Sequence, residues 1–569
     1  MVFQKALFWL ATTVLASLVC GQSNAPPGVD TWCGKPYQSK DKSINPGGQF
    51  AFPSLQKDPL LYITVHPRYT IFLETDGIGS FIVGAEISHV FGEPFDAPPS
   101  NLNVMKFQIY SQEIGSILVS QIDLNTTGNI RNFSLAQFPP RLTPYPITLY
   151  ATIPGSTKTF KSTTEIYVLP SRTYGSAVKI DNLHGGLLVQ NNINKYKGWY
   201  PIFPNGHYVD GGYLTPSTFD LTHLNTYAAQ GFNTINIVPD GGRPDQAYPI
   251  DSLSKYWDRL DELNLFNIYD MRFAFQNSTR ISDQVALWKD RTSLLMWYTA
   301  DEPDGWVYAL NSTKLAYDQL RELDPYHPVS LVLNCQDFYY EEYAAGADLI
   351  WQDAYPVGIN ATHSIPWGTV CNTTYGDCGC DNCVGSLTDV ATRLDDIQAY
   401  QAAIPYALQK PTWSVIQAFG EQSYWPRLPK GSEVLNMMML SVNHGAKGIT
   451  YWIYPSTDDV NVGSGELGKV FGTDLAMGFL FGTEPVRELR VEGASVDASA
   501  WAVGGKVMVG VANGLYFSSR GKVKIHLPEG IKVTSVESLL YGNKGWTIEG
   551  GMLVKVGLEP LEIALLVLS

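Results

Sequence analysis

Two adjacent acidic residues, Asp301 and Glu302, follow an apolar run at residues 294–300 and precede Pro303. Such a run predicts a buried strand that ends where the acidic pair begins. No helix pattern starts directly after Glu302, so a role as an N-cap does not account for it. A glutamic acid that is partly withdrawn from water has a raised pKa and can donate or accept a proton in catalysis.

Other polar and aromatic residues follow further strand-like runs in the same region of the chain. They are His207, Tyr208, Asp210, Asp240, Asp270, Arg272, Asn334, Asp353, Tyr355, Gln417, Glu421, Trp452 and Tyr454. An aspartate at a strand end is about as often the N-cap of the next helix as a functional group, which leaves Asp210, Asp240 and Asp270 open between the two roles. Carboxylates surrounded by aromatic rings suit the cleavage of glycosidic bonds, in which one acid protonates the leaving oxygen and a second carboxylate attacks or activates water.

The elements that position these residues are eight strand-like runs, each followed by a helix-like stretch, within residues 195–485. The first strand is expected in GWYPIFP, at residues 198–204, and the last in GITYWIYP, at residues 448–455. Eight such units predict an α/β fold with a (β/α)8 barrel, in which the strand ends meet at one face. The polar residues that follow the strands are therefore expected to converge there.

Strand patterns also flank the predicted barrel on both sides. Short alternating runs from about residue 60 to about residue 170 predict an N-terminal β-sandwich within residues 30–180. The stretch GSAVKIDNLHGGLLVQNN, at residues 175–192, is interpreted as a connecting segment. The chain returns to strand-like runs near its end, which predicts a second, smaller β-sandwich over residues 486–569.

The N-terminus has the pattern of a secretory signal. Lys5 precedes an apolar run at residues 6–20 that is too short for a comfortable membrane span, and small and polar residues follow, so residues 1–21 are predicted to be a signal peptide. Six Asn-x-Ser/Thr sequons predict glycosylation of a secreted, extracellular protein, in a combination typical of fungal enzymes. The sequons are at Asn125, Asn132, Asn277, Asn311, Asn360 and Asn372.

Six of the seven cysteines lie outside the predicted signal peptide. Four of them crowd into one short segment, as Cys371, Cys378, Cys380 and Cys383. Such a cluster can bind zinc, but a secreted chain and the Cys-Gly-Cys spacing favour two local disulfides in a loop at residues 357–385, without indicating which cysteines pair. Cys33 and Cys335 remain as the third pair. The stapled loop is expected to form one wall of a cleft at the barrel face.

The formal net charge of −15, without a basic run, argues against nucleic acids and anionic membranes as partners. No apolar run after the signal peptide approaches the roughly 20 residues that a membrane helix needs. The nine histidines are scattered, with neither an HExxH pattern nor a close pair, so neither a metal nor another cofactor is predicted. A neutral or weakly basic substrate fits this composition, and the oligomeric state is open.

The segment TADEPDG, at residues 299–305, resembles a motif of the clan A superfamily of retaining glycoside hydrolases. The (β/α)8 barrels of that superfamily carry an acid/base Glu after the fourth strand, usually in an Asn-Glu pair, and a nucleophilic Glu at the end of the seventh strand. The resemblance covers the barrel and implies that Glu302 is the acid/base, with Asp301 in place of the Asn. Gln417 stands near the position of the nucleophile, and Glu421 follows four residues later.

Three interpretations of the second carboxylate are open. Glu421 folds back and serves as the nucleophile, Asp353 serves as a base or electrostatic partner, or no second carboxylate acts and the barrel only binds sugar. The resemblance implies a secreted glycoside hydrolase that cleaves β-linked oligo- or polysaccharides with retention. The alternatives are a catalytically inactive carbohydrate-binding barrel and a cell-wall transglycosylase with the same site. The predicted substrate-binding residues are Asp270, Asp301, Asp353, Tyr355, Gln417, Trp425 and Trp452.

Overall fold

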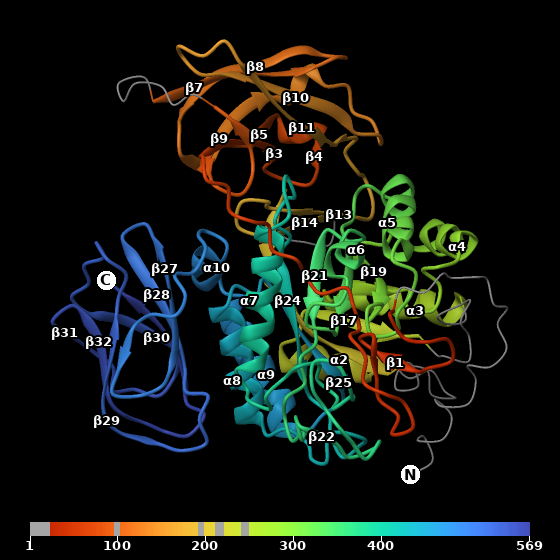
Figure 1. Ribbon diagram of the computed structural model, residues 1–569, viewed down its shortest axis with the longest axis vertical. Helices are drawn as coiled ribbons and strands as arrows, with labels where there is room; N and C mark the ends of the chain where they lie inside the picture. Colours follow the sequence, from red (N-terminus) through yellow and green to blue (C-terminus); the bar gives the residue numbers. More distant parts are fainter. Residues whose placement is uncertain (1–22, 96–102, 192–197, 211–220, 240–249) are drawn as a thin grey trace.

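The chain forms a central barrel with antiparallel β-sheets on both sides (Figure 1). Asp240 and the predicted signal peptide lie outside the described residues, as does the side chain of Asp210. The overall architecture is the one that the strand and helix patterns predict. The computed structural model describes residues 23–95, 103–191, 198–210, 221–239 and 250–569.

Eight parallel strands close into the barrel in chain order, which confirms the predicted fold class. Most of their described residues are buried, because each strand faces the lumen on one side and the surrounding helices on the other. This double burial explains why the strands appear in the sequence as continuous apolar runs. The strands are β16 (Asn205–Asp210), β17 (Thr234–Val238), β18 (Phe266–Asp270), β19 (Leu294–Asp301), β20 (Val329–Leu333), β21 (Leu349–Gln352), β24 (Thr412–Gln417) and β25 (Ile449–Tyr454).

Helices follow the barrel strands and cover their outer side (Figure 1). Their sequences are amphipathic: in α5 (Ser312–Leu323), Ala316 and Leu320 are buried, whereas Lys314 and Asp318 form an ion pair on the exposed side. The helices are α2 (His223–Gln230), α3 (Ile250–Leu263), α4 (Ser278–Trp288), α5 (Ser312–Leu323), α6 (Tyr340–Ala344), α7 (Asp389–Ala402), α8 (Gly431–Asn443), α9 (Asp458–Phe471) and α10 (Asp474–Leu480).

Two segments before the barrel differ from the sequence prediction. Most of residues 175–192, predicted to be a connection, forms the hairpin of β13 (Ser176–Ile180) and β14 (Leu187–Asn191). GWYPIFP contributes β15 (Tyr200–Ile202) to the same antiparallel sheet, so the first barrel strand is the next one, β16. An apolar run indicates a strand but does not specify which strand it pairs with, and this accounts for the error.

This three-stranded sheet closes the N-terminal mouth of the barrel. Its apolar side chains share one core cluster with residues at the starts of the barrel strands. The lumen above is packed with aromatic rings: Trp351 stacks on Trp413 with ring centroids 5.2 Å apart. Because side chains alternate along a strand, Asp353 occupies the next lumen position after Trp351, toward the C-terminal face.

The N-terminal β-sandwich consists of two four-stranded antiparallel sheets around one apolar core. One sheet contains β6 (Glu93–Pro94), β3 (Leu60–Pro67), β5 (Ile78–Ser88) and β9 (Thr126–Ser134). The other contains β11 (Thr159–Ile166), β10 (Tyr145–Thr152), β7 (Val104–Ser111) and β8 (Gly115–Asp123). A two-stranded parallel pair, β4 (Phe72–Leu73) and β12 (Val168–Leu169), lies between the sandwich and the barrel region of the chain.

The C-terminal β-sandwich has the same two-sheet design and packs against α8. Figure 1 shows it beside α8, α9 and α10. One sheet contains β26 (Val491–Glu492), β29 (Ser519–His526), β32 (Met552–Leu558) and β31 (Thr547–Glu549). The other contains β27 (Asp497–Val503), β28 (Lys506–Ala512), β33 (Ile563–Leu568) and β30 (Val536–Gly542).

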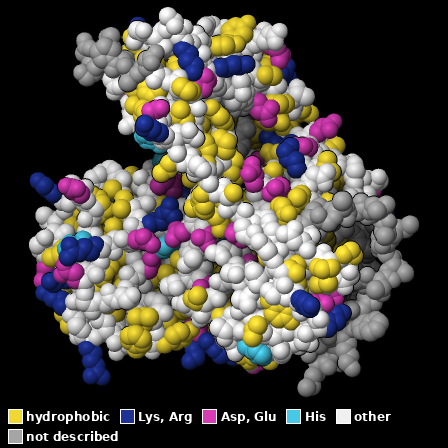
Figure 2. All heavy atoms as spheres, viewed as in Figure 1, with side chains coloured by type: hydrophobic (Ala, Val, Ile, Leu, Met, Phe, Trp, Pro, Cys, Tyr) yellow, Lys and Arg dark blue, Asp and Glu magenta, His cyan; other side chains and the backbone are white. Residues whose placement is uncertain are grey.

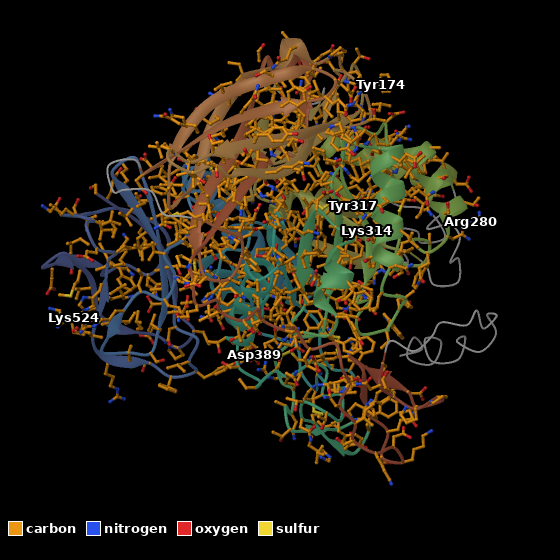
Figure 3. All side chains as sticks on the ribbon, turned by 45° about the horizontal axis from the view of Figure 1, so that its top comes forward. Tyr174, Arg280, Lys314, Tyr317, Asp389 and Lys524 are labelled. Atoms are coloured by element: carbon orange, nitrogen blue, oxygen red, sulfur yellow. A yellow bond between two sulfur atoms is a disulfide. The ribbon has the colours of Figure 1, made fainter. Side chains whose placement is uncertain are left out.

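Residues 23–52 do not join the N-terminal sandwich but run along the barrel. They form the short pair β1 (Thr31–Trp32) and β2 (Lys35–Pro36). The Gly376 N–H donates to the Pro36 carbonyl over 2.7 Å, which joins this segment to the cysteine-rich loop with β22 (His363–Ser364) and β23 (Thr369–Val370). Figures 1 and 3 show the N-terminal segment beside that loop.

On the face shown in Figure 2, charged side chains of both signs are distributed over the N-terminal sandwich, the barrel and the C-terminal sandwich. Positive charge is therefore not concentrated in one patch on that face. Among the described residues, none of the helices combines the length and apolar character that crossing a membrane requires.

Candidate active site

Glu302 and Asp353 form a hydrogen-bonded carboxyl pair at the C-terminal ends of the barrel strands. The Asn334 side chain bridges them, because its Nδ2 donates to Glu302 Oε1 over 3.0 Å and to Asp353 Oδ1 over 3.2 Å. Asp353 is 3% exposed, whereas Glu302 remains partly accessible. Glu302 is therefore the member of the pair that can meet a ligand.

The backbone at Glu302 has a φ of 50°, in the left-handed region that non-glycine residues seldom adopt. A residue in this conformation costs about 1–3 kcal/mol and persists when its surroundings fix it. The turn follows directly after β19, so it takes the chain out of the strand at the acidic residue. Strain of this kind is typical of functional positions.

Burial raises the pKa of both carboxyl groups, since the surrounding protein replaces the water that would stabilise their charges. The nearby Glu302 carboxylate raises the pKa of Asp353 further, whereas the hydrogen bond from Asp353 lowers that of Glu302. The proton therefore resides on Asp353, which donates to the Glu302 carboxylate. The pair as a unit retains one proton to a higher pH than isolated carboxyl groups do.

Asp304 fixes the chain after Glu302 to the end of β20. Its carboxylate accepts hydrogen bonds from the backbone N–H groups of Gly305, Asn334 and Cys335. Burial raises the pKa of Asp304 to about 7, although these three donors lower it. Asp304 thus positions both Glu302 and the bridging Asn334 through the backbone.

Arg272 organises a second acidic cluster beside the pair. Its guanidinium contacts Asp270 at 2.8 Å and Asp301 at 2.5 Å, and the Arg272 side chain is itself buried. The Tyr298 hydroxyl donates to the other oxygen of Asp301 over 2.6 Å. Burial raises the pKa of Asp270 to about 6 in spite of the arginine. Asp301 and Asp270, both predicted to bind substrate, are thus held by Arg272.

Gln417 is fully buried at the end of β24 and its amide is engaged by the backbone. Its Oε1 accepts from the Val357 N–H over 2.8 Å, and its Nε2 donates to the carbonyls of Val357 and Phe419 over 3.2 Å each. A direct contact between this amide and a sugar, predicted from the sequence, would require these bonds to break. In the structure, Gln417 anchors the start of the cysteine-rich loop.

Glu421 lies in the loop after β24, where its side chain is exposed and its φ is 58°. Within the described part of the chain, Glu421 makes no hydrogen bond to Glu302 or Asp353. The structure thus brings Asp353, rather than Glu421, into direct contact with Glu302. The nucleophilic role of Glu421 stays a prediction.

The aromatic residues near the pair differ in how much of each ring is free. Tyr355 is 7% exposed and lies edge-on to Phe419, with ring centroids 5.0 Å apart. Trp425 and Trp452 are partly exposed: the Trp425 indole N–H donates to the Tyr355 carbonyl over 2.9 Å, and Trp452 lies edge-on to Tyr208 at 5.2 Å. The two tryptophans are the rings that remain available for a ligand.

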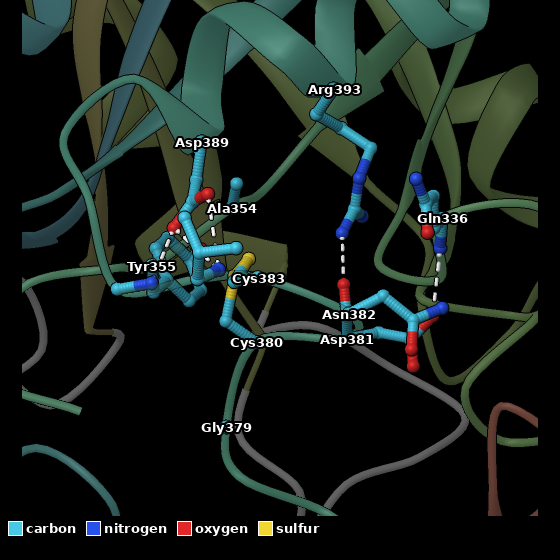
Figure 4. The surroundings of a disulfide bond; sticks show 12 residues. Gln336, Ala354, Tyr355, Gly379, Cys380, Asp381, Asn382, Cys383, Asp389 and Arg393 are labelled. Carbon is cyan, nitrogen blue, oxygen red and sulfur yellow. Dashed lines mark hydrogen bonds between the residues drawn. A yellow bond between two sulfur atoms is a disulfide. The ribbon is translucent and has the colours of Figure 1, made fainter. Parts of the chain in front are cut away.

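The cysteine-rich loop is held by two disulfides, Cys371–Cys378 and Cys380–Cys383, which confirms the disulfide interpretation over the zinc site. Among the described residues, no group of three or more His, Cys, Asp or Glu is arranged to hold a metal ion. Figure 4 shows Asp381 of this loop between Gln336 and Arg393. The Gln336 N–H donates to Asp381 Oδ2 over 2.9 Å, and Arg393 donates to the Asp381 carbonyl over 2.6 Å.

The third disulfide joins Cys33 to Cys335, the pairing expected from the two remaining cysteines. All six predicted glycosylation asparagines have exposed side chains. Exposure makes each sequon accessible, and glycosylation itself stays a prediction. 

Two residues of the site escaped the sequence analysis in part. Asn334 follows a predicted strand, but its bridging role depends on where Glu302 and Asp353 lie in space. Trp32, which lies far away in the chain, contacts Asn334 through its indole N–H over 2.9 Å. The signal that connects them is the cysteine beside each, at positions 33 and 335.

Comparison of the sequence with protein-family models and with curated proteins gives no match. Solved structures with a similar arrangement include a β-glucuronidase from Ruminococcus gnavus in complex with D-glucuronic acid (10% identity, 70% of this chain and 62% of that chain, TM-score 0.33). Others are a putative β-galactosidase from Bacteroides fragilis (11%, 88% and 69%, TM-score 0.33) and a debranching enzyme from Nostoc punctiforme (11%, 61% and 87%, TM-score 0.40). The chain spans 62% of the first of these proteins. These similarities concern the fold and assign no role to any residue.

Proposed function

We propose that the protein hydrolyses glycosidic bonds in an oligo- or polysaccharide. The observation that carries this proposal is the Glu302–Asp353 pair, which keeps a proton at the open face of a (β/α)8 barrel. Cleavage of a glycosidic bond needs an acid that protonates the leaving oxygen at a pH where ordinary carboxyl groups are ionised. The raised pKa of the pair meets that need.

The two carboxyl groups act as one proton-donating unit. Because they are hydrogen-bonded, they lie closer than the separations of about 5–5.5 Å and about 6.5–9.5 Å that characterise retaining and inverting enzymes. The proton passes from Asp353 to Glu302 along their hydrogen bond, and Glu302, the accessible member, gives it to the glycosidic oxygen as the bond to the anomeric carbon breaks. Asp353, the buried member, holds the proton between turnovers. Water then supplies hydroxide to the sugar and returns a proton to the pair.

The second catalytic role belongs to a carboxylate on the other side of the sugar. Glu421 is the residue that the family resemblance supports for this role, and its exposed loop borders the same strand ends. Cleavage of β-linkages with retention is the corresponding stereochemical proposal. The anomeric configuration of the first product, followed by NMR spectroscopy, tests it: inversion would assign a base rather than a nucleophile to this carboxylate.

The proposal is tested by measuring the release of reducing sugar from a panel of β-glycans, α-glycans and aryl glycosides. We expect the wild-type protein to act on at least one substrate and the Glu302→Gln variant to lose nearly all of that activity. Glu86→Gln is a matched control, because Glu86 is exposed on β5 of the N-terminal sandwich. Equal activity of wild type and Glu302→Gln would contradict the proposal.

A carbohydrate-binding barrel without catalysis is the second candidate, and Gln417 favours it. Gln417 stands near the strand end where the clan A superfamily, which this chain resembles, has its nucleophilic Glu. The Gln417 amide forms hydrogen bonds with the backbone of Val357 instead. The two functions differ in one assay: retardation in affinity gels by a polysaccharide that neither wild type nor Glu302→Gln degrades would establish binding alone. A transglycosylase would instead transfer the cleaved sugar to an added acceptor oligosaccharide.

The proposal includes secretion. Three disulfides and six exposed sequons suit an oxidising, glycosylating pathway. Expression in a eukaryotic host should yield protein in the medium whose mass falls on treatment with an N-glycosidase. Retention in the cytosol without glycans would contradict this part.

A further inference from the structure

Asn334 is the residue that bridges the carboxyl pair, and each of its polar groups has a partner. Its backbone N–H donates to Asp304 Oδ1 over 3.2 Å, and its carbonyl accepts from Arg393. Its side-chain Nδ2 donates to Glu302 and Asp353. The only remaining atom, Oδ1, accepts from the Trp32 indole over 2.9 Å.

The Trp32 contact determines which way the Asn334 amide points. An amide has one accepting end and one donating end, and an indole N–H can only donate. Since Trp32 faces the accepting end, the donating end of Asn334 must face Glu302 and Asp353. If the amide turned over, its NH₂ group would meet the indole N–H and its oxygen would meet the carboxyl pair.

Trp32 reaches this position on a segment that is covalently tethered to the site. The Cys33–Cys335 disulfide joins the residue after Trp32 to the residue after Asn334 across 302 positions of sequence. An ion pair between Lys35 and Asp381, both nearly buried, holds the same segment to the cysteine-rich loop. The hydrogen bond between Trp32 and Asn334 is thus fastened on both sides.

The ring of Trp32 is also held by close packing. It lies edge-on to Trp306, with ring centroids 5.2 Å apart. A Cβ atom at Gly305 would overlap the Trp32 ring, so the absence of a side chain there allows the ring to approach. Both neighbours belong to the turn that follows Glu302. The N-terminal segment therefore packs directly against the turn that follows Glu302.

We propose that Trp32 is a positioning residue, which the disulfide-tethered N-terminal segment delivers to the barrel to fix the Asn334 amide with its donors toward Glu302 and Asp353. It touches no reacting atom and acts through Asn334. The catalytic consequence rests on the proposed function, but the orientation of the amide does not. The sequence before the N-terminal sandwich is thereby part of the site.

The expected effect of losing Trp32 follows from the donors of Asn334. Two N–H groups directed at the pair stabilise its ionised forms, so their loss raises the pKa values of the pair. The other charged and titratable groups that face the pair stay in place, which makes the effect specific. They are Asp301, Asp304, Arg272, Tyr308 and Tyr355.

The decisive variant is Trp32→Phe, which removes the indole N–H and keeps an aromatic ring. Trp199→Phe is the matched control, because the Trp199 indole donates to Asp76 over 2.7 Å outside the site. In Trp32→Phe we expect both limbs of the pH profile of kcat/KM to move to higher pH by about one unit. A uniform loss of activity with unmoved limbs, or the same movement in Trp199→Phe, would overturn the proposal.

A second readout does not depend on turnover. Infrared difference spectra follow the protonated-carboxyl band of the pair, assigned as the band that Asp353→Asn removes. Its titration midpoint should rise by about one pH unit in Trp32→Phe and stay in place in Trp199→Phe. If the wild-type protein hydrolysed no glycan, the proposed function would fail, and this midpoint alone would decide the role of Trp32.

A paired variant covers the case in which Trp32→Phe does not fold. Cys33→Ser with Cys335→Ser keeps the indole but releases the tether. We expect its infrared midpoint to rise in the same direction by less than one unit, because the Trp32 contact then forms only part of the time. An unchanged midpoint in this folded variant would contradict the tethering part of the proposal.

Discussion

Two acidic clusters lie side by side at the open face of the barrel, and they accommodate buried carboxyl groups in different ways. In one, Asp270 and Asp301 contact Arg272 at 2.8 and 2.5 Å. In the other, Glu302 and Asp353 bind each other and the neutral Asn334. Among the described residues, no basic side chain forms a hydrogen bond with this second pair.

The difference shows what a cation changes at a buried site. Burial raises the pKa of Asp270 as it does those of Glu302 and Asp353, but Arg272 limits the rise at Asp270 to a value of about 6. Within the described part of the chain, the Glu302–Asp353 pair receives hydrogen bonds only from neutral donors. It therefore keeps a proton, which neutralises one of the two carboxyl charges as Arg272 does in the first cluster. The first cluster is therefore suited to holding fixed charges, and the second to moving a proton.

The largest expected effect separates the two clusters by activity. Glu302→Gln should lower kcat/KM by about 10²–10⁴-fold, because the proposed mechanism assigns the proton transfer to this group. Asp270→Asn should cost much less, since Asp270 orients Arg272 and does not exchange a proton. Steady-state kinetics on one hydrolysed substrate measures both. Equal losses would break the distinction between the clusters.

The next effect is on stability and is expected in the arginine cluster. Arg272→Met leaves the buried Asp270 and the partly exposed Asp301 without their cation, which should lower the free energy of unfolding by about 3–5 kcal/mol. Denaturant titration at pH 7 measures the loss. Adding Asp270→Asn to Arg272→Met should restore part of it. A double variant that is less stable than Arg272→Met would contradict the charge argument.

A third ionic cluster contains a cation that can itself titrate. His444 lies between α8 and the C-terminal sandwich, 2.7 Å from Asp395 and 2.9 Å from Asp497. These carboxylates raise the pKa of His444 from 6.5 to about 9, although burial opposes them. The stabilisation is complete below pH 6.5 and is lost as the pH rises through about 9.

His444→Gln should therefore be less stable than the wild type by roughly 3 kcal/mol at pH 6, with the difference shrinking toward pH 9.5. Thermal unfolding of both proteins across this range measures it. A difference that is independent of pH would show that packing, and not the charge of His444, holds this interface.

The smallest effect has the opposite sign. Asp353 retains its proton in the folded protein but ionises in the unfolded chain at pH 7, and this raised pKa costs stability at that pH. Asp353→Asn removes the cost, so we expect the free energy of unfolding at pH 7 to increase by about 1 kcal/mol or more. At pH 3 the increase should vanish. Destabilisation at pH 7 would contradict the protonated state of Asp353.

The sequence predicted the features that local patterns encode. The alternation of strands and helices identified the barrel, and the apolar run at residues 294–300 correctly placed Glu302 just after a buried strand. The prediction of the first barrel strand was wrong, because an apolar run such as GWYPIFP fits an antiparallel sheet as well as a barrel.

The rest of the site depends on contacts between distant segments. Three candidate answers for the second carboxylate remained open from the sequence because Asp353 meets Glu302 only when β20 and β21 have paired next to β19 in the barrel. The link from Trp32 to Asn334 spans 302 residues, and only the neighbouring cysteines hinted at it. Gln417 was assigned to substrate from its place in the chain, whereas its hydrogen bonds to Val357 depend on how the loop folds back.

The proton shared by Glu302 and Asp353 is tested most directly by the pH dependence of hydrolysis in the wild type and in Asp353→Asn. When the pair loses its last proton, two negative charges come to lie next to each other. This repulsion raises the pKa of that last step, so the pair stays protonated and active to a higher pH. In Asp353→Asn, Glu302 titrates without a charged neighbour at position 353. The high-pH limb of kcat/KM should therefore move to lower pH by about one unit or more. If the high-pH limb of Asp353→Asn lay at the same pH as that of the wild type, the account would be contradicted.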